Sequence, residues 1–400
     1  MYSLSVENGR PSGASHFYSI SLRYPFIALI IILFFVLYPA SPSSAQSPVS
    51  DFNPASLTES PNGIFFNGKT FWADNSLPLR AIFFDKWGGP FRPDNINRSD
   101  NYWKTEAALI NKGWRIAGFY RGELFMETNK DTIEILRMVN LKEGLPTGRV
   151  FDIDMKARGF SATGVEISNG MNLDSVSEGL MAGFTARYLR GEKIQEGKIE
   201  GKVTATGPMS YDFNLLLDYI YDENLIYNRR NTISGTGDGY SFDIGLKYIF
   251  KDNLNAEVLF RDIGGRIYWR DAPYTTANAT SDIKSYDEHG YQVYSPTIQG
   301  YESYKDFTQK IPLKTDVVFS YKREVFTLTP TVNLIGGRPL YWIEIGYQKS
   351  SDSSIMAGYN INYHAFSIGY TYKKVSFDIY LSDIDLSRAN AVGLELSLWH

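Results

Sequence analysis

The chain has 400 residues, a formal net charge of −4 and no cysteine, which excludes disulfides, thiolate metal sites and covalent haem attachment. The negative charge also excludes a general basic surface for nucleic acid. Aromatic residues make up 15% of the chain, with 28 Tyr and 25 Phe beside 34 Gly, and this composition favours a β protein.

A short apolar run at residues 26–38 follows Arg23 and is succeeded by small residues and prolines. A basic flank, a short apolar core and small residues at the −3 and −1 positions are the features of a secretory signal peptide. Ser43 and Ala45 fit those two positions. We therefore predict that residues 1–45 are a cleaved export signal.

Period-two alternation of apolar and polar residues dominates the chain after a predicted helix at residues 131–141. In the segment 240–250, for example, every even-numbered residue is aromatic or aliphatic, whereas Ser241 and Asp243 lie on the opposite face. Such alternation is typical of β-strands that have one apolar and one polar face.

Two architectures fit strands of this kind, namely a soluble sandwich and a membrane barrel. The expected strands have about 10–13 residues, as in tilted membrane-spanning strands. Aromatic residues gather at their ends, and short turns alternate with longer connections, as in outer-membrane barrels. We therefore predict an all-β fold in which residues 101–400 form an antiparallel transmembrane β-barrel of about 14 strands, within a range of about 12–16, surrounded by the lipid of a Gram-negative outer membrane.

The segment 266–310 shows no strand pattern, and we predict that it is a long outer loop. Tyrosine gives a large contact area at small entropic cost, so its tyrosines are candidate contacts for a protein partner. A loop that packs on itself above the barrel is the alternative explanation. The candidates are Tyr274, Tyr286, Tyr291, Tyr294, Tyr301 and Tyr304.

Residues 46–100 precede the predicted barrel and are rich in turn-forming and aromatic residues. A barrel of this size is too wide for its side chains alone to fill. We therefore predict that this segment is a plug in the lumen or, alternatively, a strap along the periplasmic base. Short strands are expected within it at residues 64–72 and 79–87. The plug candidates are Asn53, Pro54, Phe65, Phe66 and Trp72.

The polar face of the strands carries charges of both signs. Such charges either pair across the lumen and fill it or line a wet path. We expect Arg261 and the charges near it to set the electrostatics of the lumen. The lumen-lining candidates are Asp243, Lys247, Glu257, Arg261, Asp316, Glu344, Lys373, Asp378 and Glu395.

Three motifs give the chain a resemblance to a known family. The NPA sequence at 53–55 resembles the motif near the start of FadL-like barrels, a group that includes TraF-like and PorV-type outer-membrane proteins. The glycine-rich segment 235–245 resembles the beginning of a central strand in that group, and the DIG sequence at 262–264 resembles its recurring strand ending. The resemblance covers residues 53–55 and roughly 235–400. It implies a barrel of about 14 strands, often with an N-terminal plug and in some members with a path for a small hydrophobic ligand.

Neither an enzyme activity nor a cofactor or metal site is predicted. His364 and Ser367 are three residues apart on an expected strand, so they face opposite sides and do not form part of a triad. The glycines of 235–239 are followed by a strand pattern rather than by the Lys-Ser/Thr and helix of a phosphate loop. The sequence favours a channel for the passive passage of small or hydrophobic solutes. The alternative is a structural barrel that anchors a secretion, conjugation or electron-transfer complex.

Overall fold

The computed structural model describes residues 47–400, apart from 223–234, 252, 282–283, 287–291 and 295–296. The predicted signal peptide lies outside the described residues. Within the described part of the chain, no helix is both long and apolar enough to cross a membrane.

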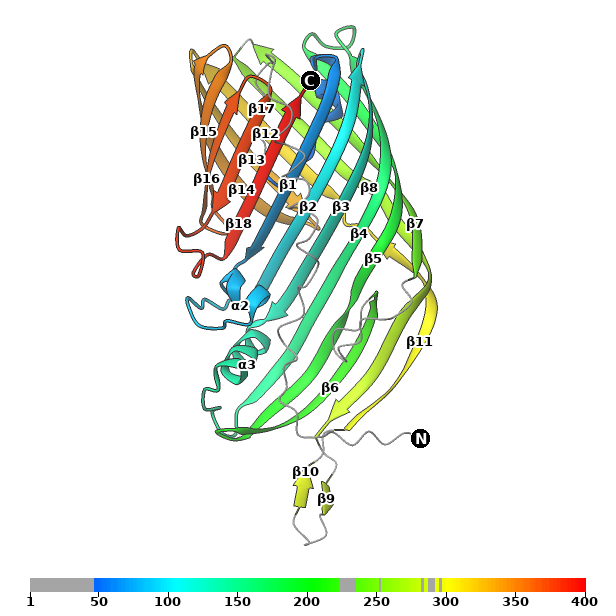
Figure 1. The fold of residues 1–400 in the computed structure, drawn as a ribbon, viewed down its shortest axis with the longest axis vertical. Coiled ribbons are helices and arrows are strands. Elements are labelled where there is room, and N and C mark those ends of the chain that lie inside the picture. The colour runs from blue at the N-terminus through cyan, green and yellow to red at the C-terminus, as the bar shows by residue number, and fades with distance from the viewer. Residues whose placement is uncertain (1–46, 223–234, 252, 282–283, 287–291, 295–296) are drawn as a thin grey trace.

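One antiparallel sheet of 16 strands makes up most of the molecule, and 14 of these strands close into a barrel (Figure 1). The first and last barrel strands, β1 and β18, pair with each other, which completes the ring. The predicted all-β transmembrane barrel of about 14 strands is therefore confirmed. In pairing order the barrel strands are β1 (Gly63–Asp74), β2 (Ile96–Asn111), β3 (Trp114–Asn129), β4 (Val150–Asn172), β5 (Leu180–Gly207), β7 (Thr236–Lys251), β8 (Leu254–Thr280), β12 (Lys314–Arg323), β13 (Phe326–Ile335), β14 (Arg338–Ser350), β15 (Ser353–Asn360), β16 (Ala365–Tyr372), β17 (Val375–Leu381) and β18 (Ala391–Trp399).

The barrel begins at residue 63 rather than at 101, because β1 lies within the segment that the sequence assigned to a plug or strap. The strand expected at residues 64–72 is observed as β1, but it belongs to the barrel wall and not to a plug or strap. The strand expected at 79–87 is also wrong, because Leu79–Phe84 form the short helix α2, which buries Leu79 and Ala81.

The two ends of the barrel differ. One end, here called the turn end, carries the C-terminus and short turns such as those at 324–325, 351–352 and 373–374 (Figure 1). The opposite end, here called the loop end, carries α2, the helix α3 (Lys130–Leu141) and the longer connections. The short turns indicated by the sequence near residues 323, 351 and 373 thus lie on one side, as expected for a membrane barrel. The loop end nevertheless has one two-residue turn as well, at 336–337.

Two further strands, β6 (Ser210–Tyr221) and β11 (Thr297–Lys310), extend the sheet beyond the loop end of the barrel. The second halves of β5 and β8 continue past the rim and pair with them. We call the projecting part of β4, β5, β6, β8 and β11 the outer wall. A separate hairpin, β9 (Lys284–Tyr286) with β10 (Gln292–Tyr294), lies at its tip (Figure 1).

The outer wall corrects the prediction of a long loop at 266–310, because β8 and β11 occupy most of that segment. Both faces of β11 are exposed between residues 298 and 304. A strand that is wet on both faces has no reason to alternate apolar and polar residues, which is why the sequence pattern did not reveal it.

The predicted helix at 131–141 is observed as α3, which packs on the outer wall. The Asn129 side chain accepts a hydrogen bond from the Thr132 backbone N–H and caps its first turn. Ile135 lies in a cluster with Phe151 and Val203 of the wall. Arg149 binds Glu134 and Asp131 at 2.5 and 2.8 Å, and these contacts raise the pKa of the Arg149 guanidinium. The two ion pairs hold one end of the helix on β4.

Apolar side chains cover the outer surface of the barrel, whereas polar ones point inward. On β7, Phe242, Ile244 and Leu246 are exposed, while Ser241 and Asp243 are buried. The same alternation on β16 leaves Ile368 68% exposed beside the buried Ser367. An apolar outer surface around a polar interior is the arrangement of a membrane barrel.

Candidate functional site

An N-terminal segment, residues 47–62, lies inside the barrel, and we call it the inserted segment. Its single helical turn, η1 (Pro54–Thr58), contacts the inner faces of β4, β5 and β7. Asn53 caps this turn, because its side-chain oxygen accepts a hydrogen bond from the Ala55 N–H at 3.0 Å. The Asn53 amide nitrogen donates to the Leu246 carbonyl and to Glu257 of the wall. The NPA sequence thus attaches the inserted segment to the barrel wall.

Three glycines provide the space into which this turn fits. Gly170, Gly183 and Gly245 are paired in register across β4, β5 and β7 and face the lumen. A Cβ on Gly170 would lie 2.6 Å from the Pro54 carbonyl oxygen, and a Cβ on Gly183 or Gly245 would overlap the NPA backbone or the Asn53 side chain. Because any side chain at these positions displaces the turn, the glycine row is a docking surface for the inserted segment.

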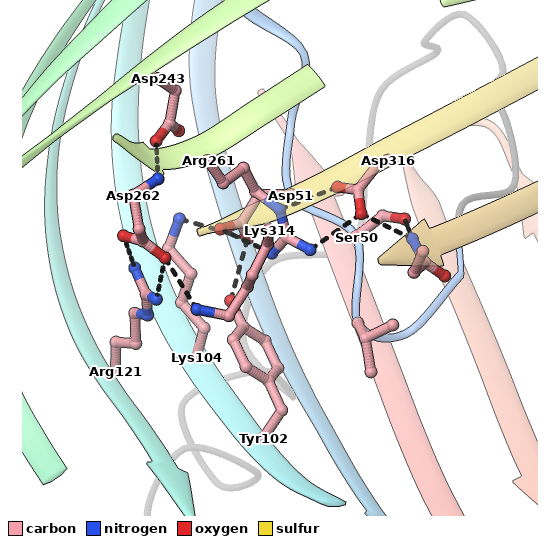
Figure 2. Close-up of polar contacts among 12 residues, drawn as sticks. Ser50, Asp51, Tyr102, Lys104, Arg121, Asp243, Arg261, Asp262, Lys314 and Asp316 are labelled. Carbon is pink, nitrogen blue, oxygen red and sulfur yellow. Dashed lines mark hydrogen bonds and ion pairs between the residues drawn. The ribbon is translucent and has the colours of Figure 1, made fainter. Parts of the chain in front are cut away.

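Asp51 of the inserted segment lies among cations that belong to the barrel wall (Figure 2). Lys69 and Lys104 are paired in register on β1 and β2, and their ammonium groups lie 3.0 and 3.6 Å from Asp51. Arg261 is 3.5 Å away, and the Tyr102 hydroxyl donates to the same carboxylate at 3.0 Å. Two like charges directly opposite each other on a sheet are unfavourable, so Asp51 neutralises a cationic site of the wall.

The contacts of Asp51 are part of one continuous ionic network in the lumen. For example, Asp262 binds Arg121 at 2.5 Å and Lys314 at 2.8 Å, and Arg261 binds Asp316 at 2.8 Å (Figure 2). No side chain of the network is more than 5% exposed. Its cations are Lys69, Lys104, Arg115, Arg121, Arg187, Arg261 and Lys314, and its carboxylates are Asp51, Glu106, Glu123, Glu166, Asp243, Asp262 and Asp316.

The network contains equal numbers of cations and carboxylates, so it is neutral as a whole. Buried charges are tolerated only when they are paired and hydrogen-bonded. Removal of one partner from such a set costs about 3–5 kcal/mol, because it leaves an uncompensated buried charge. The inserted segment supplies Asp51, and the barrel supplies all the other members. Charge balance in the lumen therefore depends on the position of the inserted segment.

Apolar layers lie on both sides of the ionic network. Toward the loop end, Phe71, Trp342 and Tyr380 pack edge to face, with ring centroids 5.5–6.5 Å apart. Toward the turn end, Phe65 and Leu57 lie in another apolar cluster, which joins β1 to the inserted segment. The aromatic layer of Phe71, Trp342 and Tyr380 therefore lies between the loop end and the ionic network.

A second group of lumen carboxylates has few partners. Asp378 lies directly opposite Glu395 on the neighbouring strand, and Asn67 donates a hydrogen bond to Glu395. Glu344 is 5% exposed and makes no hydrogen bond or ion pair with the described residues. This side of the lumen is therefore acidic, unlike the balanced network beside it.

The predicted lumen residues fall into three groups. Asp243, Arg261 and Asp316 belong to the ionic network, and Glu344, Asp378 and Glu395 form the acidic side. Lys247 binds Glu59 of the inserted segment at 2.6 Å and Glu257 at 3.5 Å. The prediction for Lys373 is wrong, because this residue lies in the turn between β16 and β17 with a positive φ of 50°, beside the Tyr372 ring.

Of the predicted plug residues, only Asn53 and Pro54 belong to the inserted segment. Phe65, Phe66 and Trp72 lie on β1, where Phe66 is exposed on the outer surface and Trp72 stacks on Trp103. This correction follows from the barrel beginning at residue 63.

Five of the six predicted contact tyrosines are described, and they lie on the outer wall and its hairpin. Tyr274 and Tyr301 contact each other across β8 and β11, with centroids 6.0 Å apart, and Tyr304 is exposed. Tyr286 and Tyr294 lie on β9 and β10, and Tyr291 lies outside the described residues.

Several central residues were missed from the sequence, among them Asp51, Lys104, Glu166 and Arg187. On β2 the sequence did contain a signal. Lys104 and Glu106 lie on the same face of the strand as Tyr102 and Ala108, because these residues are two apart. A single sequence offers no means to pair distant strands, so it could not show which cation meets which carboxylate. The glycine row was missed for the same reason, because its three members are adjacent only in the sheet.

Comparisons with known proteins agree with the observed architecture. A family model described as "Family of unknown function (DUF5723)" matches residues 97–399. A search of curated proteins finds no match. Among solved structures, the chain is similar to the TodX deltaS2S3 mutant monoaromatic hydrocarbon channel, with 11% identity, a TM-score of 0.45 and coverage of 87% of this chain and 92% of that one.

Two further structures are similar at the same level. The toluene transporter TodX of P. putida has 10% identity and a TM-score of 0.42, with coverage of 87% and 92%. A Pseudomonas aeruginosa FadL homologue has 10% identity and a TM-score of 0.41, with coverage of 87% and 91%. At these scores the likeness adds nothing to what the strand pairing itself establishes.

Proposed function

Because this chain belongs to the DUF5723 family, whose description assigns no function, we propose from its own lumen that it is an outer-membrane channel for the passive passage of small hydrophobic solutes. The observation that carries the proposal is the inserted segment, which docks on a glycine row and completes the charge balance of the lumen. A structural barrel needs neither a shaped docking surface nor a removable counter-charge.

The aromatic layer supports the proposal that the solute is hydrophobic. Phe71, Trp342 and Tyr380 lie between the loop end and the ionic network, where they form a buried aromatic cluster across the proposed path. Aromatic side chains bind apolar molecules through large contact areas. Charged solutes gain nothing from this layer, and the neutral network below it holds no excess charge for them.

In this proposal the inserted segment closes the path. The network side chains are buried, so at their level the described residues leave no wet passage. Passage requires that residues 47–62 move away from the glycine row, or at least that Asp51 leaves its cationic site. The cleaved signal peptide and the outer-membrane location are part of the same proposal, with the loop end facing the outside of the cell.

The test uses a variant that lacks residues 47–60 and retains β1. In planar lipid bilayers, we expect this variant to have a higher single-channel conductance than the wild type. A heat-modifiable gel mobility verifies that the barrel has formed. Identical conductance in both proteins would show that the segment does not close the path.

Solute class is tested separately in liposomes. We expect the variant without residues 47–60 to take up a monoaromatic hydrocarbon faster than a sugar of similar size. We expect Trp342→Ala to slow the uptake of the aromatic solute only. Equal rates for both solutes would contradict a hydrophobic path.

The outer wall favours a second candidate, an interaction barrel that holds an extracellular or secreted partner. Among the described strands, β11 pairs only with β8 and leaves its other edge beyond the barrel rim without a partner. Edges of this kind add strands from other chains. Solute uptake by the variant without residues 47–60 distinguishes the two, because an interaction barrel is expected to admit no solute class selectively.

A further inference from the structure

Four basic side chains gather on the outward face of the barrel near its loop end, and we call them the basic patch. They are Arg190 on β5, Arg266 and Arg270 on β8, and Lys310 on β11, and all four are exposed. Lys310 is paired directly with Arg266 in the β8–β11 ladder. Tyr240 is paired with Arg266 on the other side. The patch therefore covers four adjacent strands.

Among the described residues, Asp238 partly offsets this positive charge, because it is paired in register with Arg190. Asp238 binds Arg270 at 3.9 Å and accepts a hydrogen bond from Tyr188. Asp306, at the border of the patch, accepts a hydrogen bond from the Asp271 backbone N–H. Within the described part of the chain, Arg190, Arg266 and Lys310 form no ion pair with a carboxylate. Like charges directly opposite each other on a sheet destabilise it, so an anion between Arg266 and Lys310 would relieve that cost.

The height of the patch on the barrel indicates where that anion comes from. Tyr188, Tyr240 and Tyr268 lie among the cations on the same outward face, and each is between 39% and 50% exposed. Toward the turn end, this face continues with exposed apolar side chains, including Phe242 and Ile244. Tyrosines mark the boundary between the hydrocarbon and the headgroups of a membrane. The cations therefore lie at the level of the lipid headgroups.

We propose that the basic patch binds the phosphate groups of a lipid of the lipid A type, while the acyl chains of that lipid lie along Phe242 and Ile244. The inference rests on the proposed outer-membrane location with the loop end outside, because that leaflet contains phosphorylated glycolipid. Arginine and lysine are the usual ligands of phosphate, and arginine binds it through two parallel hydrogen bonds. A protein partner is a weaker fit, because the apolar belt directly below the patch is covered by acyl chains.

The test compares binding of bis-phosphorylated lipid A to three purified proteins in detergent by native mass spectrometry. The first is the wild type, and the second is the triple variant R190Q/R266Q/K310Q. The third is the control K322Q/R323Q/K349Q, which removes the same charge from exposed positions at the turn end. Arg270 is left unchanged because it already binds Asp238.

We expect the triple variant to bind lipid A at least about tenfold more weakly, because each basic side chain near an anionic lipid surface contributes roughly a factor of five. The control is expected to bind like the wild type. Lipid A without phosphates is expected to bind equally weakly to all three proteins. Equal binding by the wild type and the triple variant, or equal loss in the control, would overturn the proposal.

A second variant guards against misfolding. If the triple variant lacks heat-modifiable mobility, the single variant K310Q leaves Arg266 in place and is expected to bind about fivefold more weakly. Membrane fractionation separates the two proposals. Protein that fractionates with the outer membrane but binds no lipid A refutes only this inference, whereas protein absent from that fraction refutes the location on which it rests.

Discussion

Asn53 and Gly245 lie so close together that the Asn53 side-chain oxygen occupies the space that a β-carbon on Gly245 would need. The same strand position on β5 and β4 is also glycine, at Gly183 and Gly170. The wall therefore has a surface without side chains at the place where the NPA turn rests. The docking of the inserted segment depends on this surface and on the charges beside it. Variants of the surface and of the charges test these two contributions.

We expect Gly245→Ala to displace the inserted segment and raise the single-channel conductance. The added methyl group overlaps the Asn53 side chain, and an overpacked contact of this kind costs about 1–3 kcal/mol. The matched control is Gly346→Ala, also on the inner face, where an added Cβ would lie 3.6 Å from its nearest neighbouring atom. Conductance in bilayers that rises equally in both variants would argue against a specific docking surface.

We expect Asp51→Asn to destabilise the closed state by about 3–5 kcal/mol, because Lys69, Lys104 and Arg261 lose their shared counter-charge. Guanidinium unfolding in lipid vesicles measures the loss, and proteolysis of residues 47–62 measures release of the segment. Asp352→Asn, at a half-buried position in a turn at the turn end, is the control. An unchanged unfolding midpoint for Asp51→Asn would mean that the network does not need the segment.

Glu344→Gln and Glu166→Gln are expected to have opposite consequences, although they make the same chemical change. Glu166 binds Lys104, Arg115 and Arg187, so its neutralisation leaves buried cations without a partner. Glu344 has no such partners among the described residues, and an unpaired buried carboxylate costs free energy. Unfolding midpoints are expected to fall for Glu166→Gln and to stay constant or rise for Glu344→Gln. A fall for both would show that the Glu344 carboxylate is stabilised by a cation after all.

Ile368→Lys tests the orientation of the barrel wall. Ile368 is 68% exposed near the middle of β16, and a lysine on the lipid face at mid-membrane costs about 2–4 kcal/mol. Leu386 is 63% exposed in the connection between β17 and β18, so Leu386→Lys is expected to cost almost nothing. Equal unfolding midpoints in lipid vesicles would be inconsistent with lipid around β16.

The alternation of residues was sufficient to predict the barrel but not the contents of its lumen. On β7 the apolar and polar faces are distinct, so both the strand and its inward residue Asp243 were found. On β1 the strand was expected at residues 64–72, but the prolines around it led to its assignment to a plug or strap instead of the barrel wall. On β11, water on both faces removed the pattern altogether.

The site depends on which strands pair and in which register, and a single sequence does not contain this information. Asp51 and Lys104 are separated by a whole strand, and Arg261 lies much further along the chain. Only the sheet register brings them together. The composition of residues 46–100 suggested a plug, and the NPA resemblance located the turn of the inserted segment but not the surface that receives it.

The pairing of β1 with β18 joins the two ends of the barrel sequence. For a flexible loop of more than 300 residues, joining the ends costs on the order of 5 kcal/mol in chain entropy. The inserted segment directly precedes β1 and lies inside the ring. Because the ring is open at the turn end beside Gly63, the segment can dock before the first and last strands meet or enter afterwards through that opening. In either order, the closed ring surrounds its own gate.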